Sequence, residues 1–180
     1  MPETIQSPFE LLLDIERRGI KHAAGLPQQE EVTRPWSGIG FKIGDLHMVS
    51  AVGDVNEILH FPQITAIPGT KPWVKGMANI RGNLIPIIDL NGYLGHTTAR
   101  LNSNSRVLII NNADLWAGLL VDQVLGLKHF YDEEQVDEKP ETEDSLVQYL
   151  AGGYQQNEDN WYVFSMKSLA ENPEFYQVSM

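Results

Sequence analysis

The chain of 180 residues is long enough for one domain or for two halves that share a core, and its hydrophobic content of 42% argues against bulk disorder. It has no cysteine, which excludes disulfides, thiolate metal sites and a cysteine nucleophile and agrees with a reducing compartment. The net charge of −11 disfavours nucleic acid as a partner, because an acidic surface repels phosphates. Neither a secretory signal nor an apolar run of roughly 18–20 residues is present, so we expect a cytoplasmic protein without direct membrane insertion.

The first residues have the pattern of a helix followed by a linker. Ser7-Pro8-Phe9-Glu10 forms a capping-box pattern, with serine at the N-cap and proline in the first turn. Phe9, Leu12 and Leu13 follow with helical spacing, and residues 26–35 are polar and carry two prolines. We therefore predict an N-terminal helix and linker in residues 1–35.

From Trp36 onward the chain consists of short apolar runs that are rich in β-branched residues and are separated by Gly, Asn and Pro. This pattern predicts strands at residues 38–43, 46–51, 55–59, 84–89, 106–110, 115–121, 124–128 and 161–164. Short helices are predicted at residues 71–78, 90–94 and 144–150. Many short strands joined by tight turns indicate a mostly β fold, either barrels or a sandwich.

The two halves of the chain show a weak internal repeat. Val55-Asn-Glu-Ile-Leu59 resembles Val121-Asp-Gln-Val-Leu125, and Phe41 falls on Val107 at the same offset of 66 residues. Gly76 precedes Asp89 by the same 13 residues that separate Gly152 from Ser165. We interpret the chain as two copies of one small β-unit, each ending in a strand and a short helix.

An acidic segment lies in the second half. Between residues 132 and 144 eight carboxylates accompany a single lysine, which leaves a local net charge of −7. A solvated loop or helix is the simpler interpretation, and a docking patch is the alternative.

The sequence offers no pattern for catalysis or cofactor binding. No two of its five histidines have the i,i+4 spacing of common metal sites, and it lacks both nucleotide-binding glycine loops and the G-x-S-x-G elbow. Pairs of acidic residues are plentiful, but catalysis would also require a burying cleft. We predict no catalytic residue, no metal and no cofactor, and hence a protein that is not an enzyme.

The most distinctive stretch is residues 76–90, GMANIRGNLIPIIDL. Gly82-Asn83 can supply the positive φ of a tight hairpin turn, and the apolar residues 84–88 predict a strand buried on both faces. Pro86 lacks a ladder N–H, so this strand should lie at an edge or carry a bulge. Asp89 can cap a short helix that begins at Leu90.

Several residues here have both a structural and a functional interpretation. We favour a structural role for Pro86 and Asp89. For Arg81 we favour a role facing a partner, because an arginine beside a turn glycine is exposed and arginine is enriched at binding hot spots, although a structural salt bridge is the alternative. Val55 can be a core residue, and Glu57 is expected to be exposed with either role open.

The same stretch resembles the CheW-like domain, whose members show a G-x-x-N-x-R-G-x-x-x-P-x-x-D-L core. The matching residues are Gly76, Asn79, Arg81, Gly82, Pro86, Asp89 and Leu90. Residues 41–44, 55–59, 106–110 and 118–125 resemble other strands of the family. The resemblance implies two SH3-like, five-stranded β-barrels around a shared apolar core. It also divides the chain into residues 1–35, a CheW-like domain at 36–172 and a C-terminal tail at 173–180.

The resemblance implies a non-catalytic adaptor in membrane receptor arrays. Such adaptors bind the regulatory domain of a CheA-type histidine kinase and the cytoplasmic tip of a methyl-accepting chemoreceptor. It places Val55, Glu57 and Arg81 at these contacts, with Asn79 and Gly82 shaping the turn. Within the family, the overall pattern is most similar to the adaptors of type IV pili and twitching motility.

Two alternatives stay open at this point. One is a β-barrel protein that binds a small molecule, and the other is a regulator of the same fold that sequesters the kinase. The chain also departs from the family pattern in its second copy, where Ser165-Met166 stands in place of the more usual Asp followed by Leu or Ile.

Overall fold

The computed structural model describes residues 9, 12, 35–97, 100–112, 115–137 and 144–180. Phe9 and Leu12 are helical, while the rest of the predicted N-terminal helix and nearly all of the linker lie outside the described residues. The same holds for residues 138–143 of the acidic segment. All the strands belong to one compact unit, residues 34–180.

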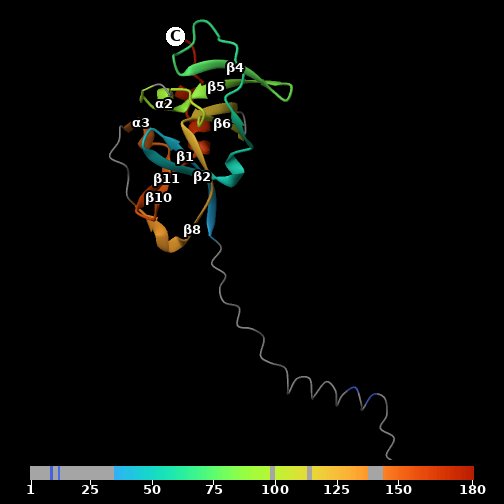
Figure 1. The fold of residues 1–180 in the computed structure, drawn as a ribbon, viewed down its shortest axis with the longest axis vertical. Coiled ribbons are helices and arrows are strands. Elements are labelled where there is room, and N and C mark those ends of the chain that lie inside the picture. The colour runs from blue at the N-terminus through green and yellow to red at the C-terminus, as the bar shows by residue number, and fades with distance from the viewer. Residues whose placement is uncertain (1–8, 10–11, 13–34, 98–99, 113–114, 138–143) are drawn as a thin grey trace, which may run out of the picture. The chain divides into compact units, whose positions relative to one another are not determined.

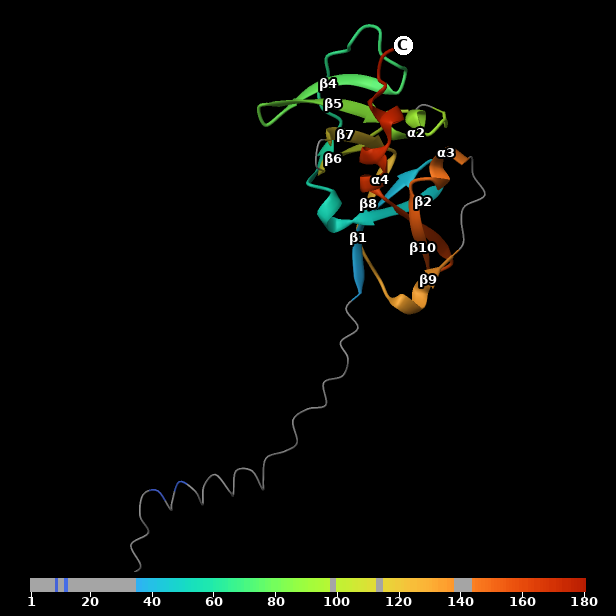
Figure 2. The ribbon, with the colours of Figure 1, turned by 180° about the vertical axis from the view of Figure 1, so that it is seen from behind.

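The described residues form two mostly antiparallel sheets, which are seen from opposite sides in Figures 1 and 2. The first sheet has the order β8-β1-β2-β11-β10-β9. Its strands are β1 (Trp36–Ile43), β2 (Leu46–Ala51), β8 (Gln123–Phe130), β9 (Gln135–Val136), β10 (Leu150–Gln156) and β11 (Asp159–Phe164). The second sheet has the order β3-β6-β7-β5-β4. Its strands are β3 (Glu57–His60), β4 (Val74–Ile80), β5 (Asn83–Asp89), β6 (Arg106–Asn112) and β7 (Leu115–Val121).

Short helical segments connect the strands. The α-helices are α2 (Leu90–Tyr93), α3 (Asp144–Val147) and α4 (Met166–Glu171), and the 3-10 turns are η1 (Val52–Asp54), η2 (Asp132–Glu134) and η3 (Pro173–Tyr176). Asp89 caps α2 by accepting a hydrogen bond from the backbone N–H of Gly92 at 3.2 Å, as predicted. Ser165 caps α4 in the same way through Ser168.

The predicted repeat is present in the topology, and its two copies exchange strands. The strands β1 to β5 of the first copy correspond in order to β6, β7, β8, β10 and β11 of the second. Each sheet takes its central hairpin from one copy and its three other long strands from the other copy. The exchange produces two parallel pairs, β2 with β11 and β5 with β7. The fold is therefore a pair of interleaved barrels.

Three apolar clusters show how the barrels are filled. One cluster, which includes Val49, Phe130 and Trp161, lies on the first sheet, and a second, which includes Ile85 and Ile87, lies on the second sheet. The third and largest joins residues of both sheets with α2, α4 and η3. Along β6, Val107 and Ile109 belong to the second cluster, whereas Leu108 and Ile110 belong to the shared one. This period of two explains the nearly continuous apolar runs, because both faces are buried.

One prediction of local structure is wrong, and another is confirmed with shorter bounds. Residues 71–78 were predicted as a helix, but β4 covers most of them. Gly76 and Ala78 are buried with the less buried Met77 between them, which is the period of a strand. The predicted helix at residues 144–150 ends at Val147, and the glycine-containing strand β10 follows it.

The strand that carries Pro86 also differs from the prediction. β5 pairs with both β4 and β7, so it is not an edge strand, and the irregularity lies in β4 between Val74 and Gly76. Burial on both faces holds from Ile85 onward, but Leu84 is 65% exposed. Leu84 is exposed because it lies near the tip of the hairpin, beyond the part of β5 that packs in the shared core at Ile88.

The C-terminal residues contact the body of the unit. Phe175 of η3 is buried in the shared core, and Ser179 forms a β-bridge with Thr70. The boundaries 1–35, 36–172 and 173–180 stay predictions.

Candidate functional site

The tip of the β4–β5 hairpin presents Arg81 to solvent. Arg81 and Gly82 have φ of 51° and 88°, which is the pattern of a two-residue type I′ turn. The backbone N–H of Gly82 donates to Asn79 Oδ1 at 2.8 Å and holds the turn. The positive φ therefore falls on Arg81 and Gly82 instead of Gly82 and Asn83. A left-handed backbone costs an arginine about 1–2 kcal/mol of conformational free energy. The turn that directs the Arg81 side chain into solvent therefore lowers the stability of the fold slightly.

The side chains of Arg81 and Glu57 form an ion pair that joins the tip of the β4–β5 hairpin to β3. Arg81 Nη2 lies 2.7 Å from Glu57 Oε1, and the two side chains are 78% and 25% exposed. The salt bridge that the sequence left as an alternative is thus present. An exposed pair of this kind contributes at most about 1 kcal/mol to stability, and the guanidinium stays accessible to a partner. Glu57 is half-buried, less exposed than predicted.

A small cleft adjoins this ion pair. It has a volume of about 160 Å³ and is lined by residues that include Glu57, Ile80, Arg81 and Trp116. Two of its lining residues are joined by a hydrogen bond, which the backbone N–H of Asn111 donates to Asn56 Oδ1 at 2.8 Å. The cleft is therefore an apolar hollow with a charged rim.

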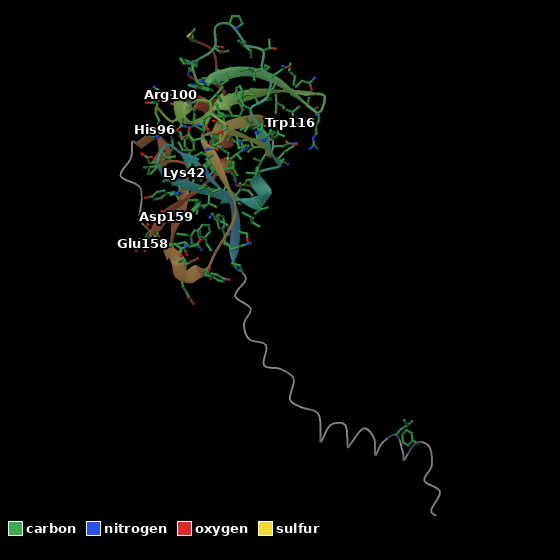
Figure 3. The ribbon with its side chains drawn as sticks, viewed as in Figure 1. Lys42, His96, Arg100, Trp116, Glu158 and Asp159 are labelled. Atoms are coloured by element: carbon green, nitrogen blue, oxygen red, sulfur yellow. The ribbon has the colours of Figure 1, made fainter. Side chains whose placement is uncertain are left out.

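Trp116 is the largest of the cleft residues that were not predicted from the sequence. Its side chain is 41% exposed, although its neighbours Leu115 and Ala117 are buried. Figure 3 shows it on the side of the view opposite to Lys42 and Asp159 of the first sheet. Strand alternation was the available signal, since a tryptophan between two core residues must point the other way. An exposed tryptophan beside an exposed arginine combines two residue types enriched at binding hot spots.

The predicted site residues fall into two groups. Glu57, Asn79, Arg81 and Gly82 come together at the hairpin tip, whereas Val55 is partly buried against the shared core. The motif residues lie within β4, β5 and the start of α2. Gly76 lies at the irregularity of β4, Pro86 is half-buried in β5, Leu90 is fully buried, and buried Asp89 pairs with Lys75 Nζ at 3.1 Å. The partner-binding roles stay predictions.

Outside the hairpin tip, the polar groups of the described residues include a buried tyrosine pair. Within the described ranges, no group of three or more His, Asp or Glu side chains is placed to hold a metal ion. Burial raises the pKa of Tyr93, and its hydrogen bond to Tyr149 at 2.7 Å adds to this effect. This hydrogen bond joins α2 to the turn between α3 and β10. Among the helices that the structure describes, none is both long and apolar enough to cross a membrane.

The two interleaved barrels and the arginine turn agree with the CheW-like domain that the sequence motif indicated. The CheW-like domain family matches residues 37–174, and the chain belongs to this family. Protein PilI of Pseudomonas aeruginosa is 43% identical over 176 residues, which cover 98% of each chain. The chemotaxis protein CheW of Helicobacter pylori is 30% identical over 122 residues, which cover 68% of this chain and 73% of that protein.

A solved structure supports the fold independently. The crystal structure of the scaffolding protein TtCheW from Thermoanaerobacter tengcongensis superposes with a TM-score of 0.67. The match covers 77% of this chain and 94% of the other, at 24% identity. It therefore shows that this chain has the same fold, in agreement with the family match.

Proposed function

We propose that the protein is a non-catalytic adaptor that couples a methyl-accepting chemoreceptor to a CheA-type histidine kinase. The observation that carries this proposal is the exposed Arg81, held outward by its turn beside the Trp116 cleft. Similarity to PilI over nearly the whole chain supports a place in the system that controls type IV pili and twitching motility. We place the adaptor in the cytoplasm, recruited to membrane receptor arrays through these two partners.

An adaptor of this kind needs two surfaces that are occupied together and no reactive group. The signal then passes as a coupling free energy between the two sites, typically about 1–3 kcal/mol. The interleaved fold suits this task, because both sheets contribute to one shared core. A partner bound to one barrel can thus influence the other through packed side chains.

The test is the charge reversal Arg81→Glu. Binding of the kinase regulatory domain and of the receptor's cytoplasmic fragment is measured by isothermal titration calorimetry, each alone and then both together. We expect affinity for at least one partner to fall more than tenfold, because the variant replaces an exposed donor by a second carboxylate beside Glu57. The melting temperature should stay within a few degrees, since the ion pair is exposed.

The matched control is Lys167→Glu on α4. Lys167 is also an exposed cation, with 74% of its side chain accessible, and it also pairs with a carboxylate, Glu171, at 3.7 Å. This variant should bind both partners within twofold of the unaltered protein. If the Arg81→Glu variant binds each partner with the same affinity as the unaltered protein, the assignment of Arg81 is refuted. An unaltered protein that binds the kinase but never the receptor would instead identify a sequestering regulator.

A further inference from the structure

An apolar pocket lies between the C-terminal residues and the β4–β5 hairpin. Its volume is about 240 Å³. Ile67 and Tyr176 line it and are 39% and 47% exposed. Four other lining side chains are buried and belong to the shared core, namely Val74, Ile88, Leu115 and Phe175. The pocket therefore opens at the surface and reaches into the core.

Backbone hydrogen bonds fix the walls of this pocket. Lys71 N donates to Val178 O at 2.8 Å, and Met180 N donates to Gly69 O at 3.0 Å. These bonds join the C-terminal residues to the loop before β4, and Figures 1 and 2 both show the C-terminus beside that loop. A pocket whose walls are already in place binds a ligand without first ordering the chain, which favours affinity.

Three aromatic side chains hold the ring of Phe175 in place. Its centroid lies 5.0 Å from that of Tyr93, 6.1 Å from that of Tyr176 and 6.2 Å from that of Trp73. Because these neighbours pack against it, the ring is not free to turn and fill the pocket. Met77 adds a thioether to the lining. Aromatic rings and thioethers both make favourable contacts with an aromatic ring, so the lining favours an aromatic ligand over an aliphatic chain.

The polar groups of the lining already have partners within the chain. Thr70 Oγ1 donates to Ile67 O at 2.9 Å, and the Tyr176 hydroxyl donates to a backbone carbonyl of α4 at 2.7 Å. None of the described residues that line the pocket is charged. Lys71 and Glu174, each next in the chain to a lining residue, have opposite charges, so neither sign of ion is favoured at the opening. An ion that entered the pocket would lose its hydration without gaining a partner, so the site selects an uncharged molecule.

The volume of the pocket sets the size of its ligand. An apolar cavity of about 150 Å³ binds benzene, so a pocket of about 240 Å³ takes a molecule of roughly ten non-hydrogen atoms.

We propose that this pocket binds an uncharged aromatic molecule of this size. The site is separate from the cleft of Glu57, Arg81 and Trp116, since no residue lines both. It is also independent of the kinase and the receptor, so the adaptor has a binding site for a small molecule besides its partner surfaces. Because the buried lining residues belong to the shared core, a bound molecule stabilises the whole folded unit.

The probe is indole, which is uncharged, aromatic and of the required size. It is titrated into the full-length protein by isothermal titration calorimetry, and differential scanning calorimetry follows the melting temperature. Benzoate and benzylamine are aromatic ions of similar size and opposite charge, and n-octanol is an uncharged aliphatic chain. We expect indole to bind with a Kd below about 1 mM and to raise the melting temperature as its concentration increases. Both ions should bind at least tenfold more weakly, and n-octanol should also bind more weakly.

Two variants fill the pocket without adding charge: Ile67→Trp at its opening and Val178→Phe on its C-terminal wall. The matched control is Ile58→Trp in β3, because Ile58 is also 39% exposed but does not line the pocket. Calorimetric melts without ligand establish that each variant is folded. Each filling variant should bind indole at least tenfold more weakly than the unaltered protein, and the control should bind it within twofold.

Four other outcomes would overturn the proposal. Indole that neither releases or absorbs heat nor shifts the melting temperature, up to its solubility limit, shows that the site is absent. If the folded filling variants bind indole as the control does, the ligand lies elsewhere. Equal binding of benzoate or benzylamine contradicts an uncharged ligand, and stronger binding of n-octanol contradicts an aromatic one. None of these results bears on the proposed function, which the Arg81→Glu variant tests separately.

Discussion

At the residue scale, side chains at one equivalent position of the repeat form hydrogen bonds between the two copies. Asn56 and Asp122 occupy equivalent places in the repeat, 66 residues apart. Asn56 Oδ1 accepts a hydrogen bond from the backbone N–H of Asn111 near the end of β6, and Asp122 Oδ2 accepts one from Gly44 after β1 at 2.7 Å. Each side chain thus caps the first strand of the other copy. Such hydrogen bonds satisfy backbone donors where the ladder ends.

His47 makes the stability of the fold depend on pH. Burial, followed by the charge of Lys42, lowers the pKa of His47, while Asp159, 3.9 Å away, opposes the shift. A pKa that is lower in the folded state means that the unfolded chain binds the proton first as pH falls. The free energy of unfolding therefore decreases below about pH 6.5, whereas above it His47 has no such effect.

We expect His47→Gln to lose less free energy of unfolding than the unaltered protein when the pH is lowered from about 7 to 5. Urea denaturation at a series of pH values measures this difference. Equal slopes for both proteins would show that His47 titrates alike in the folded and unfolded states.

Local chemistry explains which residue roles were predictable. The Asp89 cap was predicted correctly because its partner, Gly92, lies only three residues along the chain. The meeting of Arg81 with Glu57 was not, because it depends on the order β3-β6-β7-β5-β4. Trp116 joins the same cleft only after β7 has paired with both β6 and β5.

At the element scale, equivalent glycines mark an irregularity in each copy. Gly76 in β4 and Gly152 in β10 have φ of 143° and 153°, and the register shifts beside each of them. Their surroundings differ. A Cβ on Gly76 would collide with the carbonyl oxygen of Thr65, whereas one on Gly152 meets nothing within 4 Å. Substitutions at the two glycines therefore distinguish the energetic cost of backbone strain from that of steric collision.

We expect Gly152→Ala to cost about 1–3 kcal/mol of stability through strain alone. Gly76→Ala should cost about 2 kcal/mol more, because Thr65 and its two hydrogen bonds to Met77 must also shift. Chemical denaturation of both variants measures the difference. Equal losses would mean that the loop at Thr65 moves away freely.

The same glycine explains the wrong helix at residues 71–78. Apolar and polar residues do not alternate clearly in this stretch. Gly76 occupies a buried position of the strand, but a glycine does not signal burial in the sequence. Pairing with β5 decided the outcome, because it satisfies the backbone and buries Val74 and Ala78.

At the scale of the whole molecule, interleaving makes the two barrels one folding unit. Neither copy of the repeat contains a complete sheet, since each lends its outer strands to the other. The shared core includes Leu108 of β6, Phe41 of β1 and Phe164 of β11, all buried. Unfolding one barrel therefore exposes the core of the other.

We expect a single unfolding transition. Urea denaturation followed by tryptophan fluorescence and by far-UV circular dichroism should give the same midpoint, since Trp161 belongs to the first barrel and Trp116 to the second sheet. Leu108→Ala should lower the free energy of unfolding by about 2–5 kcal/mol and move both signals together. Two separate midpoints would contradict a shared core.

The sequence by itself determined the class of fold, the repeat, most strands after residue 36, the Asp89 cap and the presence of a tight turn beside Gly82. These features depend on residues close together in the chain, through alternation, turn chemistry and helix capping. The tertiary structure decided which copy each strand joins, that β5 is internal, and that Leu84 and Trp116 are exposed. Those outcomes depend on contacts between distant segments, because two strands with the same apolar pattern differ only in what finally packs against them.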